Sequence, residues 1–200
     1  MKWFALPILF ITFALGGPAF AQGVPTQTVK KTVDEVVRIV SDKEMKKPQF
    51  EKKRRQELKK AIGAVFDYGE MAQRAMARHW KDRNAAEKKE FVSLFETLLE
   101  NSYADKIESY NQEKIVYLNE RIEGEYAEVR SKVVTAKRDE YSLDYRLMNK
   151  GGKWMAYDVV IEGVSLVSNY RGQFNKIITN EGYPALLKKL KSKSAEIKAP

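Results

Sequence analysis

Apolar side chains in the first half of the chain recur at the three- and four-residue spacing of an α-helix. Residues 26–42 place Val29, Val33, Val36, Val37 and Val40 on one face. The same pattern predicts a second helix from 48 through 65 and a short third helix after Asp67. A fourth follows Asn84, which forms a capping-box pattern with Glu87. This fourth helix has the widest apolar stripe in the protein.

From residue 115 onward the period of the pattern changes from helical to alternating, which predicts strands. The four predicted strands cover 115–122, 126–136, 141–148 and 154–161, and short turns separate them. Short turns favour an antiparallel meander. Two further helices are predicted over 165–179 and 183–193. The order of helices, meander and helices predicts one α+β domain over 22–200.

The alternation also predicts which sheet face is buried. In the second strand Val129 and Val133 share one face, and the charged residues Glu128, Arg130 and Lys132 share the other. The fourth strand is apolar on both faces except at Asp158, so we expect both of its faces to be covered.

The first 21 residues have the pattern of a cleaved signal peptide. Lys2 precedes an apolar run over 3–15, and Ala19-Phe20-Ala21 matches the small-residue cleavage pattern. We therefore expect export to the periplasm. The chain has no cysteine, which excludes disulfides and thiol chemistry.

The chain is basic, with a formal net charge of +9. Such an excess favours binding to anionic surfaces, including lipid headgroups and acidic proteins. The alternative interpretation is that the charge contributes only to solubility. Nucleic acid is not an expected partner, because the ten tyrosines are dispersed and form no stacking platform beside a basic stripe.

Residues for catalysis or metal binding are sparse. The single histidine, His79, has no evident partner, and we predict no catalytic residue, no metal and no cofactor. Asp144 is predicted to form a surface ion pair with Arg146. Asp158 is expected to hold Arg171, or backbone amides of the next helix, at the strand-to-helix junction.

One segment and several shorter blocks resemble a known family. The longest matching segment is 154–174, WMAYDVVIEGVSLVSNYRGQF. The shorter matching blocks are Phe66-Asp67-Tyr68, residues 91–104 and Asp144-Tyr145-Arg146-Leu147, and all occur in the family's order. Together they resemble the MlaC family, the periplasmic phospholipid-carrying component of the Mla lipid-transport system. The resemblance implies a curved sheet of the NTF2-like kind that encloses a deep apolar cavity. It further implies a monomer that carries phospholipid between an inner-membrane ABC transporter complex and an outer-membrane lipoprotein complex.

On this reading, acyl chains enter between the helices and the sheet. A charge introduced at Leu147 or Tyr145 is then expected to weaken lipid loading. Two alternatives remain open at this point: an NTF2-like enzyme or binding protein for a small apolar ligand, and an interaction module with a filled core. The candidate lipid-binding residues are Met71, Met76, Phe95, Leu98, Leu99, Val129, Val133, Leu143, Tyr145, Leu147, Tyr157 and Val159.

Overall fold

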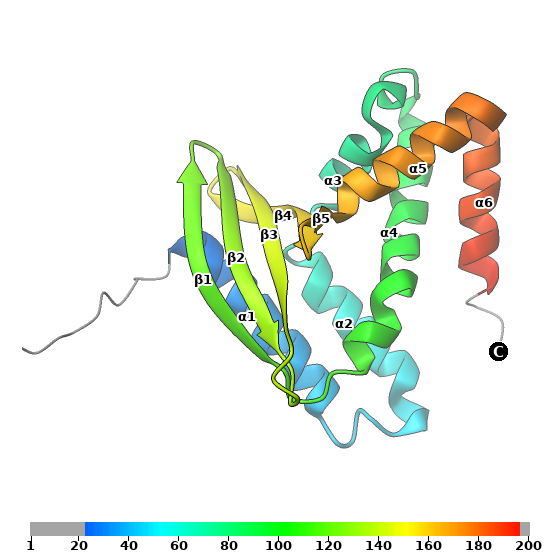
Figure 1. Ribbon diagram of the computed structural model, residues 1–200. Helices are drawn as coiled ribbons and strands as arrows, with labels where there is room; N and C mark the ends of the chain where they lie inside the picture. Colours follow the sequence, from blue (N-terminus) through cyan, green and yellow to red (C-terminus); the bar gives the residue numbers. More distant parts are fainter. Residues whose placement is uncertain (1–22, 197–200) are drawn as a thin grey trace, which may run out of the picture.

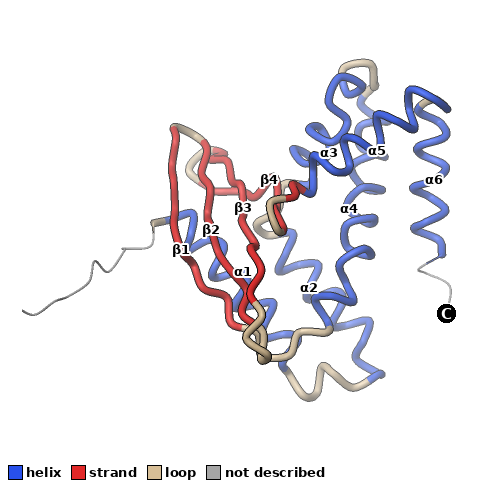
Figure 2. The backbone as a smooth tube through the Cα atoms, in the orientation of Figure 1, coloured by secondary structure: helices blue, strands red, loops and turns tan. Residues whose placement is uncertain are grey.

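The predicted antiparallel meander is present, with helices packed on it and beside it (Figure 1). The computed structural model describes residues 23–196. The strands lie together at one end of the molecule, while α3, α5 and α6 gather at the other (Figure 2). The elements are α1 (Val24–Ser41), η1 (Pro48–Phe50), α2 (Glu51–Gly63), α3 (Tyr68–Met76), η2 (Ala77–Trp80), α4 (Ala85–Glu108), β1 (Lys114–Glu123), β2 (Tyr126–Val134), β3 (Glu140–Lys150), β4 (Lys153–Ile161), β5 (Val164–Ser165), α5 (Leu166–Glu181) and α6 (Tyr183–Glu196).

This arrangement confirms the α+β prediction, with one addition to the sheet. The strand order is β1-β2-β3-β4-β5, and each neighbouring pair is antiparallel. The two-residue strand β5 was not predicted, because two residues are too few to show an alternating pattern. The predicted signal peptide, residues 1–21, lies outside the described residues.

Local side-chain caps explain why the helix starts could be predicted. The Asn84 side chain accepts a hydrogen bond from the Glu87 amide at 2.9 Å, and the Glu87 carboxylate accepts one from the Asn84 amide at 2.9 Å. The predicted capping box is therefore confirmed. Asp67 caps α3 by accepting from the Glu70 amide, and Ser165 caps α5 by accepting from the Ser168 amide. Each cap satisfies a first-turn N–H that has no partner within its helix.

The strands contain irregularities that bend the sheet. The register shifts in β1 between Tyr117 and Asn119, and again between β3 and β4 at Arg146. Such bulges increase local bending and twist. Between β2 and β3, the Ser131 amide donates to Asp144 Oδ1 at 2.9 Å. Asp144 thus binds the neighbouring strand, and the predicted ion pair with Arg146 was wrong, since Arg146 pairs with Asp158 instead.

Asp158 fastens the junction between β4 and α5. Its side chain is 3% exposed, and it accepts hydrogen bonds from the Ser165 hydroxyl at 2.6 Å and the Val167 amide at 3.0 Å. The expectation of a backbone amide partner is confirmed. The other partner considered, Arg171, donates instead to Ser168 on its own helix. With Arg146 as a third donor, the hydrogen-bonding needs of this buried carboxylate are met by protein groups.

Two large apolar clusters hold the molecule together. The first, which we call the bundle, joins α3, the N-terminal half of α4, α5 and α6. At its centre Phe174 meets Phe91 and Phe95 edge-on, with ring centroids 5.6 and 5.5 Å apart. The second joins the inner sheet face to α1, through Val29 on the helix and residues such as Val129 and Leu147 on the strands.

Helix α1 is tied to the sheet at its N-terminal end. The Glu120 carboxylate on β1 accepts hydrogen bonds from the Thr26 amide at 2.7 Å and the Thr26 hydroxyl at 2.6 Å. A negative charge here also complements the helix dipole. Residue 23 is a glycine, and a Cβ at this position would collide with the Glu120 carboxylate. The C-terminal end of α1 instead packs on α2, through Ile39, Val40 and Leu58.

Candidate functional site

A cavity of about 1100 Å³ lies between the inner sheet face, α1, α2 and the C-terminal half of α4. Its lining is predominantly apolar. The helices contribute Val33, Val36 and Val37 from α1, Leu58 and Ile62 from α2, and Leu99, Tyr103 and Ile107 from α4; the strands contribute Ile115, Val133, Tyr141, Leu143, Tyr145, Val159 and Ile161. This volume exceeds the roughly 300–1,000 Å³ of typical small-molecule sites. The internal apolar cavity expected of the fold is therefore present.

The side chains of the surrounding helices explain why protein atoms do not fill this space. α1 lines it mainly with valines, whose side chains are short. α2 is mostly charged and supplies few apolar groups to the interior. The part of this space that is walled by aliphatic side chains is expected to accept hydrocarbon.

Six of the twelve candidate residues line this cavity. They are Met71, Leu99, Val133, Leu143, Tyr145 and Val159. The structure brings these six together from α3, α4 and three different strands.

The other six candidates do not line the cavity. Met76, Phe95 and Leu98 belong to the bundle, and Tyr157 packs against it. Val129 and Leu147 belong to the sheet cluster, where both are 0% exposed. Because Leu147 is fully enclosed by protein, a charge at this position would test folding rather than lipid loading.

Sequence reasoning missed the contribution of α1 and α2 to the cavity. The valine stripe of 26–42 was recognised as the buried face of a helix, but not as the wall of a hollow. Its signal was present in the repeated choice of a short β-branched residue where longer side chains would fill a core.

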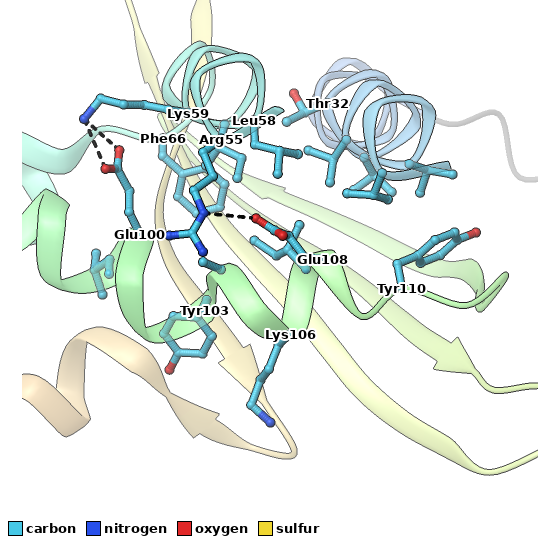
Figure 3. Close-up of a pocket in the computed structure, with 18 of the residues that line it drawn as sticks. Thr32, Arg55, Leu58, Lys59, Phe66, Glu100, Tyr103, Lys106, Glu108 and Tyr110 are labelled. Carbon is cyan, nitrogen blue, oxygen red and sulfur yellow. Dashed lines mark hydrogen bonds and ion pairs between the residues drawn. The ribbon is translucent and has the colours of Figure 1, made fainter. Parts of the chain in front are cut away.

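Charged side chains of α2 and α4 form one edge of the cavity, which we call the rim (Figure 3). Lys59 Nζ lies 2.9 Å from Glu100 and 3.0 Å from Glu96, and Arg55 Nε lies 3.4 Å from Glu108. Burial raises the pKa of Glu100 above its ordinary value, although the ion pair with Lys59 opposes this shift. The rim is thus partly desolvated, and ion pairs connect α2 to α4 across it.

The groups most suited to catalysis lie elsewhere or are already engaged. His79 Nε2 lies 3.0 Å from Asn175 Oδ1 and does not line the cavity. Within residues 23–196, no group of three or more His, Asp or Glu side chains is placed to hold a metal ion. In the same part of the chain, no helix combines the length and apolar character needed to cross a bilayer.

Comparisons with known proteins agree on one family. The family model described as MlaC protein matches residues 30–192. The intermembrane phospholipid transport system binding protein MlaC of Haemophilus influenzae is 22% identical over 201 residues, covering 98% of this chain and 94% of the relative. Its name denotes a binding protein of a transport system.

A solved structure resembles this fold closely. It is the phospholipid-binding protein from Ralstonia solanacearum in complex with a phospholipid, with a TM-score of 0.77 and 26% sequence identity. The match covers 86% of this chain and 98% of the solved one.

Proposed function

Since the chain belongs to the MlaC family, we propose that it is a periplasmic shuttle that carries phospholipid by its acyl chains. The observation that supports this proposal most directly is the apolar cavity of about 1100 Å³ between the sheet and α1, α2 and α4. The phospholipid bound to the Ralstonia solanacearum protein shows what a similar fold accommodates.

The energetics of hydrocarbon in water favour a closed carrier. Exposing an acyl chain to water costs about 0.8 kcal/mol per methylene, so a free chain does not cross an aqueous space readily. Transfer from a bilayer to an apolar cavity is nearly balanced, because neither environment is aqueous. A carrier therefore needs a dry space of sufficient size, and no chemical step.

The charged rim suits the headgroup in this proposal. Acyl chains would lie against the valines of α1 and the inner face of the sheet. The headgroup would remain near Arg55 and Lys59, where water and charged side chains are both accessible.

The proposed route runs between an inner-membrane ABC transporter complex and an outer-membrane lipoprotein complex. The name of the Haemophilus influenzae relative, an intermembrane phospholipid transport system binding protein, supports this placement. The predicted signal peptide agrees with a periplasmic location, and the net charge of +9 favours encounters with anionic surfaces.

Solvent extraction of the purified protein followed by mass spectrometry tests the proposal. We expect phospholipid near one molecule per chain. Absence of lipid, combined with failure of the lipid-free protein to take up phospholipid, would contradict the carrier function. Recovery of a different small ligand would favour the NTF2-like enzyme or binding protein instead.

A pair of matched variants tests whether phospholipid binds in the cavity. Val36→Asp places a charge on the α1 wall, and it should lower phospholipid loading by more than about tenfold, because the carboxylate must be desolvated or admit water. Val116→Asp makes the same change on β1, outside the cavity lining, where the side chain is 39% exposed. This control should load normally. Equal loading by both variants would place the acyl chains elsewhere.

A further inference from the structure

Strand β3 presents two tyrosines to the cavity. Tyr141, Leu143 and Tyr145 alternate along the strand, share its inner face and all line the hollow. The two phenol groups therefore interrupt a wall that is otherwise aliphatic at this position.

Tyr145 is the more informative of the two, because it is buried. Its side chain is 7% exposed and lines the cavity. Burial raises the pKa of Tyr145 above its ordinary value, so the phenol stays neutral and keeps its proton. The hydroxyl therefore remains a hydrogen-bond donor in the wall of a largely apolar space. A ligand atom that accepts a hydrogen bond would satisfy this donor.

The surroundings of Tyr145 select the kind of acceptor. The residues that the sheet strands contribute to the cavity are all uncharged, whereas the basic lining residues Lys52, Arg55, Lys59 and Lys106 lie on α2 and α4. An anionic phosphate beside Tyr145 would be buried without a cation, which is strongly unfavourable. A neutral carbonyl oxygen carries no such penalty.

We propose that the Tyr145 hydroxyl donates a hydrogen bond to an ester carbonyl oxygen of the carried glycerophospholipid. This inference rests on the proposed function, because it assigns a polar subsite within the same cavity. The ester carbonyls are the polar atoms nearest to the acyl chains, and they enter the cavity with them. Tyr145 thereby distinguishes ester-linked lipids from ether-linked ones, which lack the carbonyl.

Two probes and one isosteric variant test this subsite. The probes are phosphatidylglycerol with ester-linked chains and its dialkyl ether analogue of equal chain length. Lipid-free wild-type protein should bind the ester lipid about 3- to 10-fold more tightly than the ether lipid, as expected for one net hydrogen bond. Tyr145→Phe should abolish this preference by weakening ester binding alone, because the ether lipid never used the hydroxyl.

Tyr117→Phe is the matched control. The Tyr117 hydroxyl is buried without a partner, but Tyr117 does not line the cavity. Its removal should leave both affinities and their ratio at the wild-type values.

The outcomes separate this inference from the proposed function. A Tyr145→Phe protein that keeps the ester preference, or that loses both lipids equally, overturns the subsite while leaving the carrier function in place. Wild-type protein that takes up neither lipid contradicts the carrier function itself.

Discussion

The bundle and the sheet end of this protein are built from similar apolar side chains but are packed differently. In the bundle, the aromatic rings of Phe91, Phe95 and Phe174 contact one another, and Phe91 and Phe95 are 0% exposed. At the sheet end, α1, α2 and the strands surround a cavity of about 1100 Å³, although the N-terminal part of α1 packs on the sheet through Val29. Helix α4 belongs to both: its first half packs in the bundle, and Leu99, Tyr103 and Ile107 face the hollow.

This contrast suggests that one region of the fold provides stability and another provides space for a ligand. The bundle buries the rings of Phe91, Phe95 and Phe174 against one another, so we expect it to hold the fold without help from a ligand. The sheet end leaves apolar surface without protein contacts, and a ligand can supply them. Helix α4 contributes residues to both ends and so connects them.

The largest effect should come from truncating the same residue type at each end. Phe95→Ala removes a ring from the filled bundle and should lower the free energy of unfolding by about 3–5 kcal/mol. Phe66→Ala removes a partly buried ring that already borders the cavity, and it should cost only about 1–2 kcal/mol. Denaturant unfolding of the lipid-free variants measures both. Equal losses would mean that the sheet end is as tightly packed as the bundle.

Removing the lipid should affect the two ends unequally. Phospholipid at 100 times its dissociation constant should stabilise the folded protein by about 2.7 kcal/mol. By hydrogen exchange, amides of α1 and α2 should exchange faster after lipid removal, while those of α5 and α6 change little. Uniform acceleration through all helices would contradict the division into a filled and a hollow end.

The smallest effect concerns the rim. Glu108 accepts from Arg54 at 2.6 Å, with the two side chains 18% and 12% exposed. Glu108→Gln should cost about 1–2 kcal/mol, between the values for surface and buried ion pairs, and should speed amide exchange in α2.

An exposed ion pair provides the control for this change. Glu181→Gln removes the partner of Lys189, and both of those side chains are about half exposed. It should cost less than about 0.5 kcal/mol. If the two variants behave alike, the rim does not hold α2 to α4.

Features determined by nearby residues could be predicted from the sequence. Periodicity and the caps at Asp67, Asn84 and Ser165 located the helices within a few residues, because each cap depends on an amide three positions away. Asp158 was placed at its junction because its partners Ser165 and Val167 follow it closely, seven and nine residues further along the chain. The partner of Asp144 was predicted wrongly, since the Ser131 amide reaches it from another strand.

The candidate site was harder to predict than the fold. The sequence pattern of inward-facing apolar residues is the same whether those residues pack against other side chains or line a cavity. Phe95 and Leu99 lie on one stripe of one helix and both belong to the bundle, but only Leu99 also borders the cavity, because of where α1 and α2 lie. Those positions depend on contacts between segments far apart in the chain.

The attachment of α1 has a consequence for how the cavity could open. The N-terminal end of the helix is held where the Glu120 carboxylate accepts hydrogen bonds from Thr26, at the end remote from α2. A helix fixed at one end moves most at the other, so we expect opening to displace the C-terminal end of α1 most. Movement of α2 with it would require the ion pairs to α4 to break.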